Sequence, residues 1–223
     1  MCIRDRSKSI KLKPGTYTLT ETKAPDDYLV ADPVEFKVVK MCIRDSVDAV
    51  RALQRAGLAS PVRTVADGGS AGGLLMGAVA NMAPECFAGI EADVPFVDAL
   101  TSILDPSLPL TVTEWDEWGD PLHNADVYRY MKEYTPYENA PADANDARVA
   151  VFPKIFITTS MNDTRVLYVE PMKWLARLQR AGVDAVAKIE VEAGHGGTSG
   201  RYKQWEEISY ENAWCLGVMG ITS

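Results

Sequence analysis

The sequence predicts an α/β fold with a mostly parallel sheet and helices on both faces. From residue 47 onward, short apolar runs alternate with longer amphipathic stretches, as where 154–160 precedes 170–182. That alternation is typical of strand–helix–strand units, which build parallel sheets. A glycine-rich turn at 68–73 joins one such run to an apolar helical stretch, which fits a sharp strand-to-helix connection. A small β-patterned fragment precedes this region.

The composition narrows the classes of partner. The 223 residues are 47% hydrophobic and 24% charged. This apolar content is sufficient for a hydrophobic core without disulfides or structural metals. The net charge of −8 argues against a nucleic-acid partner. The four cysteines have no metal-binding spacing, and no apolar run in the sequence is long enough to cross a membrane. We therefore expect no metal, no cofactor, no nucleic-acid partner and no membrane partner.

A hexapeptide occurs twice, at 1–6 and at 41–46, as Met-Cys-Ile-Arg-Asp followed by Arg or Ser. A structural repeat would continue into the neighbouring residues, and this one does not. We interpret both copies as the same non-native sequence, similar to adapter scars in translated environmental reads. The alternative is a genuine short duplication. Under the first interpretation, 7–40 and 47–223 have separate origins.

Residues 7–40 carry two predicted strands, at 17–22 and 34–39, each beside turn-forming proline or glycine. The run from Pro14 to Pro25, followed by Tyr28, resembles the last strands of Cna-B/SpaA-type β-sandwich modules of Gram-positive surface proteins and pilins. In that family a glutamate at the position of Glu21 can promote a Lys–Asn isopeptide bond. The strands that would carry those partners are not identifiable here, so we expect Glu21 to be an ordinary polar residue.

Residues 47–223 alternate between helical and strand patterns. We expect Tyr202, Trp205, Ile208 and Leu216 of the last helix to face the core. The predicted elements are helix 47–58, strand 62–66, the turn 68–73, helix 71–82, strand 87–94, a short helix or turn at 96–104, an acidic loop at 110–121, helix 124–134, a loop at 136–148, strand 154–160, helix 170–182, strand 187–192 and helix 202–217.

The turn at 68–73 reads Gly-Gly-Ser-Ala-Gly-Gly and contains the Gly-x-Ser-x-Gly pattern of a nucleophile elbow around Ser70. Alone the pattern is weak, because a glycine-rich loop is more often a simple turn. Its context is stronger, since a predicted strand leads into it and a predicted helix follows. Ser70 is therefore a candidate nucleophile.

Two further residues complete a candidate triad. Asp163 and His195 each follow a predicted strand, and the order Ser, Asp, His is that of α/β-hydrolases. The sequence holds two histidines, and His123 lies in a polar stretch where a surface role is expected. His195 would be the base, and Asp163 would orient it. The alternative for Asp163 is an Asn-Asp turn, which is common after strands.

The residues around these positions resemble the prolyl oligopeptidase family of serine peptidases, and within it the oligopeptidase B group. The resemblance covers about 47–221 and implies an incomplete α/β-hydrolase domain with Ser70 as nucleophile, Asp163 as orienting acid and His195 as base. The Ala71 backbone N–H would be one oxyanion donor. The matching runs are 68–75, 94–98, 109–119, 162–166 and 193–197.

The acidic stretch at 110–121 is interpreted through the same resemblance. Oligopeptidase B cleaves after Lys or Arg, and carboxylates of this stretch receive the basic P1 side chain. Glu114 and Asp116 occupy the matching positions, although Asp116 is one methylene shorter than the usual Glu. A carboxylate pair suits a guanidinium or ammonium group. Without the resemblance, a solvated acidic loop would be the default interpretation.

The expected function is therefore serine endopeptidase activity on short peptides with a basic P1 residue. An esterase or acyl-aminoacyl peptidase of the same fold is one alternative, and a surface adhesin or pilin fragment at 7–40 is another. We expect the peptidase part to be cytoplasmic and 7–40 to derive from a cell-surface protein. Oligomeric state is left open.

The resemblance also indicates what the chain lacks. The family's gating β-propeller is not recognisable here, nor are the first strands of the hydrolase domain with the tyrosine that supplies a second oxyanion donor. We therefore expect the 223-residue polypeptide to be inactive.

Overall fold

The structure is a computed structural model that describes residues 15–20, 33–38, 43–197 and 200–221. The chain divides into two compact units, Met1–Cys42 and Ile43–Ser223, and each is considered by itself. The first hexapeptide and Glu21 lie outside the described residues. None of the described helices is long and apolar enough to span a membrane.

The first unit contains two described strands, β1 (Gly15–Leu19) and β2 (Val34–Val38), which pair antiparallel. Gly15 lies opposite Val38 and Leu19 opposite Val34. The sequence predicted both strands, with β1 shifted two residues toward the amino terminus. A pair of strands is at best marginally stable alone, so this unit depends on further contacts for a fixed fold.

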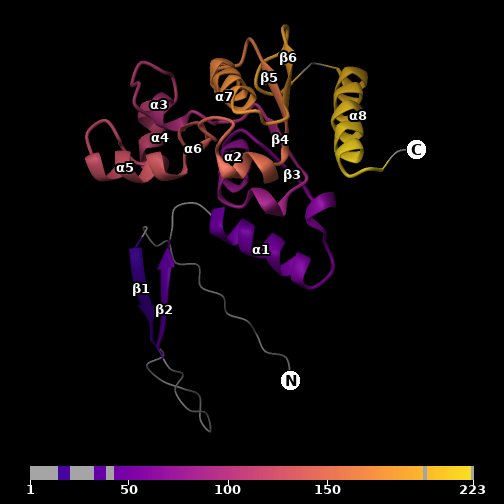
Figure 1. Cartoon of the computed structure of the whole chain (residues 1–223). Helices are drawn as coiled ribbons and strands as arrows, with labels where there is room; N and C mark the ends of the chain where they lie inside the picture. Colours follow the sequence, from indigo (N-terminus) through magenta and orange to yellow (C-terminus); the bar gives the residue numbers. More distant parts are fainter. Residues whose placement is uncertain (1–14, 21–32, 39–42, 198–199, 222–223) are drawn as a thin grey trace, which may run out of the picture. The chain divides into compact units, whose positions relative to one another are not determined.

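The second unit is built on a four-stranded parallel sheet in the order β3-β4-β5-β6 (Figure 1). Each strand pairs in parallel with the strand that follows it in the chain. The predicted parallel sheet is therefore confirmed. Strand β3 starts at Val65, three residues after the predicted start, and includes the first two glycines of the elbow. The strands are β3 (Val65–Gly69), β4 (Gly89–Asp93), β5 (Lys154–Ser160) and β6 (Ala185–Glu190).

Helices connect these strands and cover the sheet. The helices are α1 (Ile43–Arg55), α2 (Ala71–Met82), α3 (Ala99–Ile103), α4 (Thr111–Trp118), α5 (Ala125–Tyr134), α6 (Pro136–Asn139), α7 (Val169–Arg180) and α8 (Arg201–Val218), and short 3₁₀ turns occupy Pro61–Arg63, Pro84–Cys86 and Ala147–Val151.

The two faces of the sheet have different covers. Helices α2 and α7 pack on one face, and α8 stands against β4 on the other (Figure 1). Alternation along β4 separates the faces, because Ile90 and Ala92 point opposite to Gly89 and Glu91. A Cβ added at Gly89 would lie 3.0 Å from the Trp214 side chain, so α8 approaches closely at that residue. Helices on both faces agree with the predicted fold class.

Helix α1 begins earlier than the sequence predicted. It starts at Ile43, inside the second hexapeptide, whereas the predicted start was residue 47. Ile43 is buried together with Val47 and Val50, which share one face of the helix at positions i, i+4 and i+7. The last four residues of the hexapeptide thus form the first turn of α1. The helix ends at Arg55, and Gly57 follows with a φ of +72°.

The predicted acidic loop at 110–121 is wrong in its secondary structure. Thr111–Trp118 forms α4, and Gly119 ends it with a φ of +93°. Buried Thr111 and Trp118 are one heptad apart, and the half-buried Glu114 and Trp115 lie between them on the same face. This helical spacing was present in the sequence and was obscured by the number of carboxylates.

The orientation predicted for the last helix is also wrong. The bounds agree within a residue, but Tyr202, Trp205, Ile208 and Leu216 are exposed. A different face of α8, with Glu211, Trp214 and Val218, is partly buried. The aromatic residues of this helix surround its axis, so the apolar pattern did not define which face would pack.

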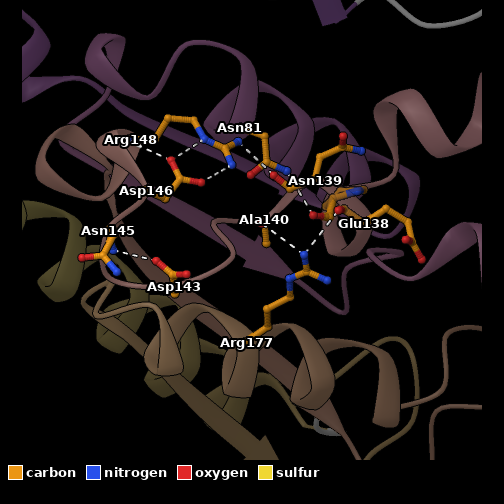
Figure 2. Close-up of polar contacts among 10 residues, drawn as sticks. Asn81, Glu138, Asn139, Ala140, Asp143, Asn145, Asp146, Arg148 and Arg177 are labelled. Carbon is orange, nitrogen blue, oxygen red and sulfur yellow. Dashed lines mark hydrogen bonds and ion pairs between the residues drawn. The ribbon is translucent and has the colours of Figure 1, made fainter.

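The segment between α5 and β5 contains no long helix or strand, and hydrogen bonds from arginine side chains fix its position. Arg148 bonds to the Asp146 carboxylate and donates to the Asn139 carbonyl oxygen at 2.9 Å (Figure 2). Arg177 of α7 reaches the carbonyl oxygens of Glu138 and Ala140, each at 3.4 Å. The predicted loop at 136–148 is correct apart from the single turn of α6 and the start of the 3₁₀ turn Ala147–Val151. These arginines hold the segment against α7.

Candidate active site

Ser70 lies at the apex of a tight turn between β3 and α2. Its backbone has φ 58° and ψ −120°, outside the regions that residues with a side chain usually adopt. The glycines around it permit close approach. A Cβ on Gly68 would lie 2.8 Å from the Gly72 carbonyl oxygen, and one on Gly73 would lie 2.4 Å from the Pro95 Cβ. The turn therefore needs glycine at both positions and has the geometry of a nucleophile elbow.

His195 and Asp163 meet Ser70 at the carboxyl end of the sheet. The Ser70 Oγ lies 3.2 Å from His195 Nε2, and His195 Nδ1 lies 2.7 Å from Asp163 Oδ2. The three side chains follow β3, β5 and β6, so parallel strand ends bring them together. The Asp163 side chain is fully buried and that of His195 is 19% exposed. In this arrangement the Ser70 hydroxyl can transfer its proton to the His195 imidazole, whose orientation is fixed by Asp163.

The aspartate is itself fixed by backbone donors. Asp163 Oδ1 accepts from the N–H of Arg165 at 2.8 Å and of Val166 at 3.0 Å. Oδ2 is left for His195. The turn proposed as an alternative for Asp163 is thus present, and it orients the carboxylate toward the imidazole.

The loop that carries His195 is tied to the end of β5. The Ser160 hydroxyl donates to the Ala193 carbonyl oxygen. The Asn162 side-chain amide donates to the Val191 carbonyl oxygen at 2.9 Å. These bonds join the two loops that hold Asp163 and His195, so the hydrogen-bonded pair belongs to one connected corner of the sheet.

A cavity of about 230 Å³ opens beside Ser70. Ala71 and Glu114 line it, whereas Asp116 is exposed and is not among the lining residues. The structure therefore brings one of the two predicted acidic residues to the cavity. The Glu114 carboxylate accepts the indole N–H of Trp118, which fixes its position on α4. The wall is completed by apolar residues, among them Phe96, Ile103, Leu108, Pro109, Leu110 and Val166.

The cavity also contains residues that the sequence interpretation missed. Glu170, Ser102 and Arg165 line it. Glu170 is 3% exposed, and burial raises the pKa of its carboxyl to about 7. A glutamate in the first turn of a helix reads as an ordinary helix-start residue, so its burial had no signal in the sequence.

The other candidate groupings are separate from this site. His123 is exposed and lies 2.7 Å from the Asp120 carboxylate, in agreement with the surface role expected for it. In the part of the chain that the structure describes, Glu91, Asp93 and Glu211 have carboxylates within 4.8 Å of one another. Burial raises the pKa of Glu91 to about 7, and its carboxyl accepts a hydrogen bond from the Cys215 thiol.

Residues 31–222 match the sequence model of the prolyl oligopeptidase family. The chain belongs to the prolyl oligopeptidase family. Two curated relatives show the extent of the similarity. "Protease 2" of Moraxella lacunata is 47% identical over 180 residues, which is 79% of this chain and 25% of that protein. "Dipeptidyl aminopeptidase BI" of Pseudoxanthomonas mexicana is 43% identical over 182 residues, which is 80% of this chain and 24% of that protein.

Solved structures of family members agree. Oligopeptidase B from Leishmania major superposes with a TM-score of 0.74 at 38% identity, covering 80% of this chain and 24% of that one. Oligopeptidase B from Trypanosoma brucei, with covalently bound antipain, superposes with a TM-score of 0.74 at 36% identity. This match also covers 80% of this chain and 24% of that one. The predicted resemblance to the oligopeptidase B group is confirmed. This chain spans about a quarter of the length of these relatives.

Residues 7–50 also match the model of the SpaA prealbumin-like fold domain. This agrees with the resemblance predicted for the first segment. The two matched ranges overlap at 31–50, a stretch that includes the second hexapeptide. The separate origin of the two segments stays a prediction.

Proposed function

We propose that residues 43–223 form the catalytic part of a serine endopeptidase that cleaves peptides after Lys or Arg. The observation that carries this proposal is the hydrogen-bonded chain from Ser70 Oγ through His195 to the buried Asp163. It occurs at a strained elbow, in a chain that belongs to a peptidase family. The Trypanosoma brucei relative carries covalently bound antipain, so that protein forms a covalent bond with a ligand.

The mechanism follows from the geometry of these three side chains. Ser70 Oγ attacks the scissile carbonyl carbon while His195 Nε2 takes its proton. The Asp163 carboxylate accepts a hydrogen bond from His195 Nδ1–H, which fixes the tautomer and stabilises the imidazolium. His195 then gives the proton to the leaving amine, and the acyl group stays on Ser70. Water, activated by the same histidine, releases the acid and restores the hydroxyl.

The Ala71 N–H is suited to stabilise the developing oxyanion. Ala71 is the first residue of α2, and the first N–H groups of a helix have no intrahelical acceptor. The residue also lines the cavity beside Ser70. A donor so placed meets negative charge as it forms on the carbonyl oxygen.

Glu114 is the P1 carboxylate in this proposal. It lines the cavity that begins at Ser70, and its position is fixed by the Trp118 indole. A guanidinium or ammonium group in a partly desolvated cavity gains most from a charge-assisted bond of this kind. Asp116 is exposed at the outer side of α4, so we assign it a weaker influence on P1.

We further propose that the 223-residue polypeptide is inactive by itself. In the described part of the chain no tyrosine lines the cavity, so the second oxyanion donor expected for the family has no counterpart there. Loss of one such donor lowers the rate by roughly 10²–10³. A fluorophosphonate probe should therefore fail to label Ser70 in the purified chain, and clear labelling would contradict this proposal.

The peptidase proposal is tested by exchange into a whole relative. Residues 43–223 replace the matching quarter of the 47% identical Moraxella lacunata protein. Cleavage of blocked peptidyl amides with Arg, Lys, citrulline or Pro at P1 is then measured. We expect hydrolysis after Arg and Lys, lost in S70A. A folded exchange protein that prefers Pro or citrulline would contradict the basic specificity.

A second candidate is removal of dipeptides from a free amino terminus. The name of the Pseudoxanthomonas mexicana relative, which is 43% identical, favours it. The same exchange protein separates the two activities through one change of substrate. An endopeptidase cleaves an amino-blocked arginyl amide, whereas a dipeptidyl aminopeptidase requires the unblocked dipeptide.

A further inference from the structure

The cavity beside Ser70 contains a second carboxylate that is more buried than Glu114. Glu170 stands in the first turn of α7, 3% exposed, and lines the same cavity as Ser70 and Glu114. In the described structure its hydrogen-bond donors are uncharged groups, and no lysine or arginine is bonded to it. A buried carboxylate without a cationic partner is costly unless it has a role or holds a proton.

The two oxygens of Glu170 are held in place by fixed donors. Oε1 accepts from the Ser102 hydroxyl at 2.5 Å, and Oε2 accepts from the Asp98 N–H at 3.0 Å. One donor lies just before α3 and the other near its end, so the two bonds fix the orientation of the carboxyl. Each oxygen still has a second lone pair for a ligand donor.

The charges around Glu170 come from several elements. Asp98 precedes α3 and forms an ion pair with Lys173, one turn along α7 from Glu170. Glu114 on α4 and Arg165 on the β5–α7 loop line the same cavity. Burial is the largest cause of the rise in the pKa of Glu170 to about 7. The hydrogen bonds from Ser102 and the Asp98 N–H lower this pKa, the Asp98 charge raises it and the Lys173 charge lowers it. The carboxyl is therefore poised between its neutral and charged forms near neutral pH.

We propose that Glu170 is a second specificity-determining carboxylate, which with Glu114 selects a cationic P1 side chain long enough to reach the floor of the cavity. This rests on the proposed basic specificity and extends it. A bound guanidinium favours the ionised carboxyl, so binding of an arginine side chain releases a proton from Glu170 to solvent.

Because ligand binding is coupled to proton release from Glu170, the affinity for a cationic side chain depends on pH. Below about pH 7 Glu170 is largely protonated, and a cationic side chain must displace that proton. Above about pH 7 the Glu170 carboxyl is already ionised. Affinity for a cationic side chain therefore rises through neutral pH, while affinity for a neutral isostere does not. Taking the ratio of the two affinities cancels any effect of pH that acts equally on both ligands.

The test measures binding to the full 223-residue chain by NMR titration, with N-acetyl-arginine amide and its neutral isostere N-acetyl-citrulline amide. The ratio of the citrulline Kd to the arginine Kd should rise about tenfold between pH 5.5 and 8.5 in the unmodified protein, the gain of a hydrogen bond to a charged group. In E170Q the ratio should be flat with pH. A ratio that still rises in E170Q overturns the proposal.

Two variants keep the outcome interpretable. In E114Q the ratio should fall at every pH but still rise with pH. In S102A, loss of a donor that favours the charged form should move the midpoint of the rise to higher pH, a change that a merely structural role would not produce. If E114Q lowers the ratio and E170Q does not change it, only the role of Glu170 is wrong. If the unmodified chain shows no preference for arginine at any pH, the basic specificity falls as well.

Discussion

The two faces of the central sheet are packed very differently. On the α2 and α7 face, Leu74, Ile90, Ile157, Trp174 and Leu178 are fully buried. On the α8 face, Phe156 of β5 is buried against Tyr210 and Trp214, but the large apolar side chains of α8 itself are mostly exposed. The carboxyl of Glu91 is also buried on this face, where it accepts a hydrogen bond from the Cys215 thiol at 2.9 Å.

The difference has a functional side. The elbow of Ser70 opens α2 on the well-packed face, whereas His195 lies in the loop that leads to α8. The nucleophile is therefore held by a dense core. The base is held mainly by local bonds, through Asp163 and the contacts between the two strand-end loops. Burial on one face of a sheet does not require equal burial on the other.

Truncation of core side chains gives the largest expected contrast. L178A on α7 should lower the free energy of unfolding by about 2–5 kcal/mol, because a fully buried leucine leaves a cavity. W205A on α8 removes a larger side chain that is 55% exposed, and should cost less than about 1 kcal/mol. Urea unfolding of both variants measures the difference. Equal losses would mean that α8 is packed as tightly as α7.

Added methyl groups test the same contrast with less disruption. G73A places a Cβ 2.4 Å from the Pro95 Cβ and 2.6 Å from its Cα, which the backbone of the elbow cannot relieve. We expect a loss of about 3 kcal/mol. G89A meets Trp214 and Val218 of α8 at 3.0 Å, where side chains can shift, and should cost about 1 kcal/mol. A larger loss in G89A would contradict the description of α8 as the looser cover.

The pH dependence of stability should reveal the buried carboxyl on the α8 face. The pKa of Glu91 is raised to about 7 by burial, so the folded state holds a proton that the unfolded state has lost above about pH 4.5. Its contribution to stability is present below pH 4.5 and is lost as pH rises through 7. E91Q should therefore be more stable than the unmodified chain at pH 8, by on the order of 2 kcal/mol, and nearly equal at pH 4.

This comparison of variants is made by urea unfolding at the two pH values, with D67N as a control for a nearby carboxylate that is exposed. If E91Q shows the same difference at pH 4 and pH 8, the ionisation of Glu91 is not the cause. If D67N shows the same pH-dependent gain in stability as E91Q, the summed negative charge near Glu91 is responsible, not the burial of Glu91 itself.

The sequence predicted the parts of this unit that follow from strong local rules. Alternating apolar runs placed β4 to β6 and α7 within a few residues, and the elbow and strand ends located Ser70, Asp163 and His195. What it did not predict depends on tertiary packing. The α4 helix was hidden by its carboxylates, the inner face of α8 by aromatic residues all round its axis, and the burial of Glu170 by its ordinary place in a helix start.

The most direct test of the central claim is covalent labelling of Ser70. The exchange protein that carries residues 43–223 in the Moraxella lacunata relative is treated with a fluorophosphonate probe, and the modified residue is found by peptide mass spectrometry. We predict one adduct on Ser70, absent in S70A and formed at least about 10³-fold more slowly in H195A. An exchange protein that hydrolyses its substrates while Ser70 stays unmodified, or an H195A variant labelled at the unmodified rate, would contradict the account.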